Sequence, residues 1–246
     1  MIYVVSDIHG QYEKIVKLLE VIDFKSTDDL YILGDIIDRG PEIVKVVDLV
    51  MSTPNIHMIL GNHEDMFLNY WRTKSIWDEG LWYKNGGGKT DAEFSRLPQS
   101  KVEEYVKFFE SLPIEMELRV NDKVYWLVHG NYVTEKERNY FNPLEYRSNI
   151  IWGRIKKEDT GPKDKMVIFG HTPTDRYLGK DNPLAIWKNG NVIGIDCGLA
   201  KISVYEDLKD NLITKDEYIT LKHEFEMRRR DALDSIAQIN IEIERL

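Results

Sequence analysis

Residues 31–40, with the sequence YILGDIIDRG, combine the features of a buried strand and of a reactive site. The first residues lean apolar, as in a strand of a covered sheet, and Gly34 allows the backbone to turn sharply after them. Three charged side chains, Asp35, Asp38 and Arg39, then follow within five positions. The stretch therefore predicts a strand that delivers charged groups to a site at its end.

Two other stretches repeat this arrangement. Residues 2–6 are mostly apolar and lead into Asp7-Ile8-His9-Gly10, while residues 56–60 lead into Gly61-Asn62-His63-Glu64. Three predicted strands thus each end in polar groups that could bind a metal ion.

Helical patterns separate these strands. Apolar residues recur at helical spacing over residues 11–22, over residues 41–51 and after His63. Pro41 stands where we expect the first turn of the second helix, a position that proline favours. Alternating strands and helices predict a largely parallel sheet whose strand ends gather on one side, where ligands usually bind.

The second half of the chain is richer in strands. Residues 74–112 predict an inserted helical cap, and strands are expected over residues 115–120, 123–128 and 166–169, with a hairpin around Asn189-Gly190. Two of these strands run into His129-Gly130 and Gly170-His171. We therefore predict an α/β fold of two mixed sheets packed as a sandwich, with β-α-β units, a helical cap insertion and a C-terminal helix.

Residues 206–246 are dominated by charge. Their apolar residues step by four and three, which predicts a helix with a narrow apolar seam formed by Ala232, Ile236, Ile239, Ile243 and Leu246. Such a helix could lie on the domain or associate with a second copy. We expect a domain over residues 1–205 and a helical tail over residues 206–246.

Composition narrows the class of protein. A chain of 246 residues with a net charge of -9 is acidic, which argues against general binding to nucleic acid or to an anionic membrane. A single cysteine, Cys197, excludes an intramolecular disulfide and fits a reducing compartment. The sequence shows no span for a bilayer and no secretory signal before the first strand. We expect a soluble cytoplasmic protein.

The string Gly87-Gly88-Lys89-Thr90 resembles the end of a nucleotide-binding P-loop. That motif needs a further glycine five residues before Gly88, where Tyr83 stands, and a strand ahead of it. We therefore expect no P-loop.

The residues that follow the predicted strands form a set of metal ligands: Asp7, His9, Asp35, Asn62, His129 and His171. Carboxylate, amide and imidazole donors suit manganese, iron or zinc better than calcium. Two ions fit if one carboxylate bridges them, and Asp35 is the candidate because its strand lies between the other two. Two ions held in this way can clamp a phosphoryl group for hydrolysis.

Other residues of similar chemistry receive no role. His57 begins a predicted strand instead of following one, and His223 lies in the charged tail. Cys197 lacks an arginine at the distance that a cysteine phosphatase needs, because Ser203 occupies the sixth position after it. We interpret Cys197 as structural.

The motifs together resemble the calcineurin-like metallophosphoesterases over about residues 1–200, and within them the bacterial and phage serine/threonine phosphatases of the lambda phosphatase type. The resemblance rests on the five strand-end motifs, on Asn85-Gly86-Gly87-Gly88 and on Trp152-Gly153-Arg154. The sequence departs from that family after Ala200, where the tail resembles a helical segment of large serine recombinases.

The resemblance implies roles for individual residues. Asp7, His9 and Asp35 would bind one ion, and Asp35, Asn62, His129 and His171 the other, most simply manganese, with iron or zinc as alternatives. A hydroxide between the ions would attack phosphorus directly. Arg39 and Arg154 would bind the phosphate, and His63 would protonate the leaving alcohol while Asp38 holds its imidazole.

Three functions remain open from the sequence. The first is a serine/threonine protein phosphatase acting on phosphorylated proteins or peptides. The second is a hydrolase of dinucleoside polyphosphates such as diadenosine tetraphosphate, although Glu64 after Asn62-His63 favours the protein phosphatase branch. The third is an inactive scaffold that keeps the phosphatase fold.

Overall fold

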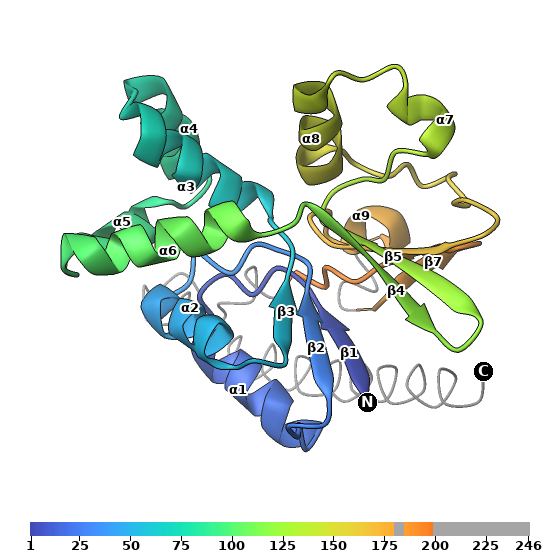
Figure 1. The fold of residues 1–246 in the computed structure, drawn as a ribbon, viewed down its shortest axis with the longest axis horizontal. Helices are drawn as coiled ribbons and strands as arrows, with labels where there is room; N and C mark the ends of the chain where they lie inside the picture. The colour runs from blue at the N-terminus through green and yellow to red at the C-terminus, as the bar shows by residue number, and fades with distance from the viewer. Residues whose placement is uncertain (180–184, 199–246) are drawn as a thin grey trace, which may run out of the picture.

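The computed structural model describes residues 1–179 and 185–198. The chain opens with β1 (Ile2–Val5), α1 (Tyr12–Val21), β2 (Asp29–Ile32), α2 (Ile43–Ser52) and β3 (Ile56–Met58). Helices follow as α3 (Asn62–Thr73), α4 (Ile76–Lys84), α5 (Gly88–Phe94) and α6 (Gln99–Ser111). The second half contains β4 (Glu115–Val120), β5 (Lys123–Val128), α7 (Glu135–Arg138), α8 (Pro143–Trp152), β6 (Met166–Phe169), α9 (Asp175–Leu178), β7 (Trp187–Asn189) and β8 (Val192–Gly194). The sequence does not predict α7, α8 or α9, but the other elements come in the predicted order (Figure 1).

The strands form two sheets. In the first, the order is β1-β2-β3 and all pairs are parallel. In the second, the order is β4-β5-β6-β8-β7, with parallel pairs in the middle and an antiparallel pair at each edge. The last residues of the parallel strands stand in register, since Val5 pairs with Ile32 and Val128 with Phe169. The loops that leave these strands therefore start at one common edge of each sheet.

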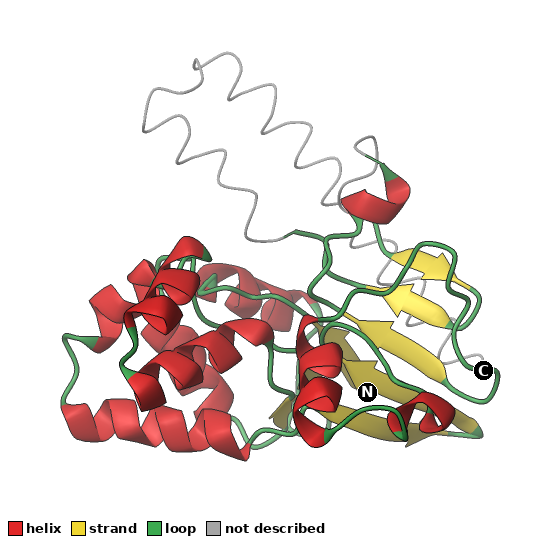
Figure 2. Cartoon of the chain, turned by 90° about the horizontal axis from the view of Figure 1, so that it is seen from above, coloured by secondary structure: helices red, strands yellow, loops and turns green. Residues whose placement is uncertain are grey.

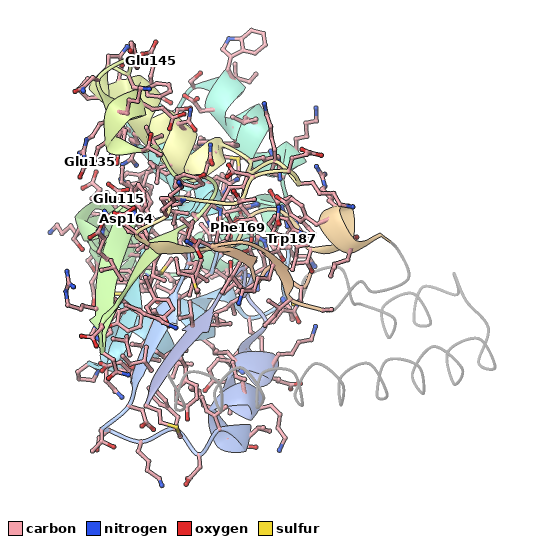
Figure 3. All side chains as sticks on the ribbon, turned by 90° about the vertical axis from the view of Figure 1, so that its right-hand side faces the viewer. Glu115, Glu135, Glu145, Asp164, Phe169 and Trp187 are labelled. Carbon is pink, nitrogen blue, oxygen red and sulfur yellow. The ribbon has the colours of Figure 1, made fainter. Side chains whose placement is uncertain are left out.

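Side-chain alternation divides the core into layers. Leu30 and Ile32 of β2 join one hydrophobic cluster with α1 and α2, whereas Tyr31 and Leu33 face a second cluster shared with the other sheet. Strands β5 and β6 alternate in the same way, and Phe169 packs with Trp187 at a ring-centroid distance of 6.0 Å (Figure 3). Period-two patterning thus buries both faces of each sheet, which confirms the predicted two-sheet sandwich.

The predicted insertion over residues 74–112 is helical. Trp82, Tyr105 and Phe109 are completely or almost completely buried, and they share one hydrophobic cluster with Val46 and Val47 of α2. Most helices lie to one side of the stacked strands (Figure 2). The helices of this segment are therefore packed into the core of the first half, and they can carry side chains to the ends of its strands.

Two local predictions need correction. Pro41 does not lie in the first turn of α2, because the helix begins at Ile43 and Glu42 is its N-cap residue. Glu93 of α5 instead accepts hydrogen bonds from the first amides of the helix, at 3.0 Å from both Ile43 N and Val44 N. The hairpin forms, but its turn is Gly190-Asn191 and Asn189 belongs to the strand, because Asn189 pairs with Val192.

The tail over residues 206–246 lies outside the described residues, and so do the apolar seam and the recombinase resemblance that we assigned to it. The boundary at residue 205 stays a prediction. Within residues 1–179 and 185–198, no helix is long and apolar enough to cross a membrane.

Candidate metal centre

The structure brings most of the predicted ligands together at the ends of the parallel strands. Asp7 and His9 follow β1, Asp35 follows β2, and Asn62 begins α3 just after β3. From the second sheet, His129 follows β5 and His171 follows β6. All are buried except His171, which is half-buried. The edge where these strands end is therefore the candidate site.

The backbone at these positions takes a conformation that side chains rarely adopt. Asp7, His9, Asp35 and His171 have φ angles of 53°, 46°, 57° and 60°, in the left-handed region. Bonds between the loops hold them there, such as His9 N to Asp35 O at 2.9 Å. Asp38 and Arg39 share this conformation, with φ of 70° and 66°. Strained backbone of this kind concentrates at functional sites, because the surrounding fold must enforce it.

Gly61 allows the ends of β2 and β3 to approach closely. A Cβ atom at this position would lie only 2.2 Å from Asp35 Oδ1 and 2.4 Å from Asp35 N. Any other residue would therefore displace the central carboxylate of the site.

Asp35 stands between two groups of imidazoles. Its Oδ2 lies 3.8 Å from His9 Nε2 and 3.8 Å from His63 Nε2, and its Oδ1 lies 3.4 Å from His129 Nε2. His9, Asp35 and His63 form one set of atoms that could hold a metal ion, and Asp35, His129 and His171 form another. A carboxylate shared by two such sets has the position that a bridging ligand requires.

The atoms around His129 fit a cation. Its Nδ1 donates to the carbonyl of Leu33, so a lone pair on Nε2 points toward Asp35 Oδ1 and toward Asn62 Oδ1, which is 3.0 Å away. Three facing acceptors repel one another unless a proton or a metal ion sits between them. Burial is the largest single influence on the pKa of His129 and lowers it, but the charge of Asp35, the hydrogen bond to Asp35 and the charge of Asp7 together raise that pKa to about 10.

His9 and His171 are neutral imidazoles, the form that binds metal ions. Burial and the neighbouring His63 hold the pKa of His9 well below its usual range, and its Nδ1 donates to the carbonyl of Ile37 at 2.9 Å. This leaves the lone pair of Nε2 directed into the site. Burial and His129 lower the pKa of His171 to about 3, and its buried Nε2 has no hydrogen-bond partner among residues 1–179 and 185–198.

Asp7 lies at the margin of the centre. Its Oδ2 accepts hydrogen bonds from the backbone N of His171, at 3.0 Å, and from the hydroxyl of Ser6. Asp7 belongs to neither set of clustered ligand atoms among the described residues. Burial, then the charges of Asp196 and Asp35, raise the pKa of Asp7 well above its usual range. The role of Asp7 as a metal ligand stays a prediction.

His63 and Asp38 form a buried pair beside Asp35. His63 Nδ1 donates to Asp38 Oδ2 at 2.6 Å, so its Nε2 is left facing the centre. The exposed side chain of Arg39 contacts two imidazoles of the site. Its Nη1 donates to His9 Nε2 at 2.9 Å, and its Nη2 donates to His63 Nε2 at 2.8 Å. The planar fork of Arg39 therefore spans two imidazoles at the exposed side of the site.

Arg154 approaches from the end of α8. Its Nη1 donates to Thr172 Oγ1 at 2.8 Å and to the carbonyl of His171 at 3.4 Å, so it lies beside the second set of ligands. Asp65 of α3 anchors the end of α8, because its Oδ2 accepts a hydrogen bond from Trp152 Nε1 at 3.1 Å. Arg39 and Arg154 thus enter from the two halves of the molecule.

Glu64 holds the loops of the site together, a role that the sequence analysis did not predict. It is completely buried, and its Oε2 accepts from Asp35 N and Gly61 N at 2.9 and 3.1 Å. Its Oε1 accepts from Ile36 N and Ile37 N at 2.9 and 3.3 Å. Burial and the charge of Asp35 raise the pKa of Glu64 to about 7. This carboxylate ties the loop after β2 to the loop after β3 and so places Asp35.

We expect Glu64→Gln to weaken both the fold and the binding of metal ions. Each Glu64 oxygen accepts two amides, so the NH2 group of glutamine must face two buried N–H donors in either orientation. The free energy of unfolding should fall by about 2 to 4 kcal/mol in denaturant titrations. Affinity for manganese, measured by calorimetry, should fall about 10-fold to 100-fold because Asp35 loses its support.

Glu93→Gln is the matched control for this variant. Glu93 also accepts two backbone amides, but they belong to the start of α2 and do not touch the metal ligands. The Glu93→Gln variant should have a lower free energy of unfolding than the wild-type protein and the same affinity for manganese. Equal manganese affinity in the two variants would contradict the role given to Glu64.

Of the residues without an assigned role, His57 and Cys197 lie within the described residues and His223 lies outside them. His57 stacks on Tyr31 at a centroid distance of 4.8 Å and bonds Asp29 at 2.9 Å, near the opposite ends of the strands. Burial raises the pKa of Cys197 to about 12, which keeps it a thiol at neutral pH.

Comparison with known proteins agrees with this geometry. Residues 1–198 match the calcineurin-like phosphoesterase family. Serine/threonine-protein phosphatase 2 of Salmonella typhimurium is 32% identical over 188 residues, which are 71% of this chain and 80% of that protein. The symmetrical bis(5'-nucleosyl)-tetraphosphatase of Wigglesworthia glossinidia brevipalpis is 40% identical over 80 residues, 31% of this chain and 29% of that protein.

Solved structures share the fold. A candidate diadenosine tetraphosphatase matches with a TM-score of 0.53 and 20% identity, covering 80% of this chain and 83% of that chain. A protein serine/threonine phosphatase of Saccharomyces cerevisiae matches with a TM-score of 0.51 and 16% identity, covering 78% of this chain and 65% of that chain. With the family match over residues 1–198 and the Salmonella relative aligned over most of its length, the chain belongs to the calcineurin-like phosphoesterase family.

Proposed function

We propose that this chain is a serine/threonine protein phosphatase that hydrolyses phosphomonoesters with the help of two divalent ions, most simply manganese. The observation that carries the proposal is the placement of Arg39 and of the His63–Asp38 pair around Asp35. An anion-binding fork and a proton donor then stand next to each other beside a shared metal ligand. Phosphoryl transfer to water needs these three elements together.

Asp7, His9 and Asp35 would hold one ion, and Asp35, Asn62, His129 and His171 the other. When bound, such ions supply an activated water and neutralise phosphoryl charge. His63 also belongs to a set of clustered ligand atoms with His9 and Asp35. We assign it to proton transfer instead, because Asp38 holds its Nδ1 and its Nε2 is the atom available to the leaving group.

Arg39 would change partners when a substrate binds. Its fork matches two oxygens of a phosphoryl group, which are stronger acceptors than the two imidazole nitrogens that it contacts in this structure. Its departure from His63 Nε2 would free that nitrogen to take up a proton from bulk water, while the proton on Nδ1 stays with Asp38. Nε2 of His63 would then donate this proton to the leaving alcohol.

The extent of similarity supports protein substrates over dinucleotides. The similarity to the Salmonella protein phosphatase runs through 71% of this chain, whereas that to the tetraphosphatase covers 31%. The second candidate, a hydrolase of diadenosine tetraphosphate, is favoured by the higher identity within that shorter segment.

We expect the metal-stripped protein to regain phosphatase activity with manganese and to prefer a phosphoserine or phosphothreonine peptide over diadenosine tetraphosphate. The measurement is kcat/KM for each substrate, from release of inorganic phosphate and from nucleotide chromatography. A preference of about tenfold or more would be enough to separate the two substrates. Faster cleavage of the dinucleotide would favour the second candidate. Activity on neither substrate in a folded, metal-loaded protein would favour the inactive scaffold.

A further inference from the structure

Asp38 is held by more than its histidine. The carboxylate is completely buried, and besides His63 Nδ1 it accepts hydrogen bonds from two side chains of the helical segment over residues 74–112. Trp82 Nε1 of α4 lies 3.0 Å from Oδ1 and 3.1 Å from Oδ2. Thr90 Oγ1 of α5 donates to Oδ1 at 2.5 Å. A buried carboxylate with these three donors has one fixed orientation.

Thr90 also holds the backbone of Asp38. The amide N of Asp38 donates to Thr90 Oγ1 at 3.0 Å, so one hydroxyl accepts from the main chain and donates to the side chain of the same residue. Asp38 has a φ of 70°, a conformation that needs such support. Thr90 itself is completely buried. Its hydroxyl therefore fixes both the main-chain amide and the carboxylate of Asp38.

The glycine-rich turn before Thr90 also contacts residues around Asp38, namely Trp82 and Arg39. A Cβ atom at Gly87 would lie 2.5 Å from ring atoms of Trp82, so glycine allows the indole to reach Asp38. The carbonyls of Asn85 and Gly86 accept hydrogen bonds from Arg39 Nε and Arg39 N, at 3.3 and 3.2 Å. The segment over residues 85–90, which includes the string that resembles the end of a P-loop, thus packs against Asp38 and Arg39.

We propose that Thr90, together with Trp82, is a positioning residue for the phosphatase reaction: it holds Asp38 so that the imidazole of His63 presents Nε2 to the leaving group. This inference rests on the proposed function, because it concerns the group that donates the proton. Thr90 touches no reacting atom and acts through Asp38.

Thr90→Val tests this role, because valine has nearly the shape of threonine and lacks the hydroxyl. A group that aligns a proton donor matters most when the leaving group needs protonation. We expect kcat for a phosphoserine peptide to fall about 10-fold to 100-fold, and kcat for 2,4-dinitrophenyl phosphate to fall much less, because dinitrophenolate leaves without a proton. Thr90→Ser keeps the hydroxyl and should restore the peptide reaction.

Two controls separate positioning from packing. Thr53→Val removes a hydroxyl that bonds the carbonyl of Leu49 at 2.7 Å, away from the site, and should leave both reactions unchanged. In the metal-free protein, proton NMR should show the Nδ1 proton of His63 far downfield, because it lies in a 2.6 Å bond to a carboxylate. This signal should move or broaden in Thr90→Val and persist in Thr90→Ser.

Trp82→Phe removes the donor that Trp82 supplies to Asp38, and its activity should depend on the leaving group in the same way. This variant provides the test if Thr90→Val does not fold. Equal losses for both substrates, or an unchanged His63 proton in a folded variant, would overturn the inference. If the wild-type protein hydrolyses neither substrate with manganese, the proposed function fails first, and the NMR comparison still tells whether Thr90 positions the pair.

Discussion

Replacing Asp35 with asparagine is expected to reduce manganese-dependent turnover by about 10³-fold or more, because several kcal/mol of transition-state stabilisation depend on the metal ions. Asp35 belongs to both sets of clustered ligand atoms, so a neutral amide would weaken both of the proposed metal sites. The change in shape is small, and the hydrogen bond from His63 N to Oδ1, at 3.0 Å, can be kept. The measurement is the initial rate of phosphopeptide hydrolysis against manganese concentration.

Asp29→Asn is the matched control, at the start of the strand that Asp35 follows. Asp29 begins β2, is more than a third exposed and bonds His57, so it lies away from the ligands that follow the strand. This variant should keep normal activity. Calorimetry should show weaker manganese binding in Asp35→Asn. Normal turnover in Asp35→Asn would rule out Asp35 as a shared metal ligand.

Replacing His63 with asparagine is expected to lower turnover of a phosphoserine peptide by about 10²-fold to 10⁴-fold, the usual contribution of a positioned proton donor. Asparagine keeps a polar group near Asp38 but offers no acidic proton. Manganese affinity should stay close to that of the wild-type protein, because we assign His63 to proton transfer. The two measurements are kcat on the peptide and the dissociation constant for manganese by calorimetry.

The manganese measurement decides between two readings of His63. Its Nε2 lies 3.8 Å from Asp35 Oδ2, as does His9 Nε2, so position alone would also allow metal binding. A large loss of manganese affinity would make His63 a ligand and leave the proton donor unassigned. His57→Asn is the matched control, because His57 also pairs with an aspartate, Asp29, and lies apart from the centre.

Much of the fold follows from local patterns. Strands β1, β2, β3, β5 and β6 lie in short, mostly apolar runs that end at a glycine or a polar residue, and the helices of the first half show the expected spacing. Predictions from the local sequence were less accurate where a side chain distant in the sequence bonds to the element. Proline at position 41 suggested an earlier start for α2, yet the helix begins at Ile43, whose amide Glu93 of α5 binds.

The sequence alone determined which residues meet, since the carboxyl ends of parallel strands lie at one edge and residues that follow them become neighbours. Asp35, Asn62, His129 and His171 come together in this way. Tertiary structure decided the rest. Asp7 lies outside both clustered sets of ligand atoms, and Glu64, Trp82 and Thr90 are tied to the site.

These contacts were out of reach of sequence reasoning for a physical reason. Thr90 and Asp38 are 52 positions apart, so no periodicity or spacing relates them, and only the packing of α5 against α2 and the loop after β2 brings them together. The left-handed backbone at Asp35 and Asp38 likewise has distant partners, because the amide of Asp35 donates to Glu64 and that of Asp38 to Thr90. It persists because hydrogen bonds from distant segments outweigh the local preference of each residue, and those bonds exist only in the folded chain.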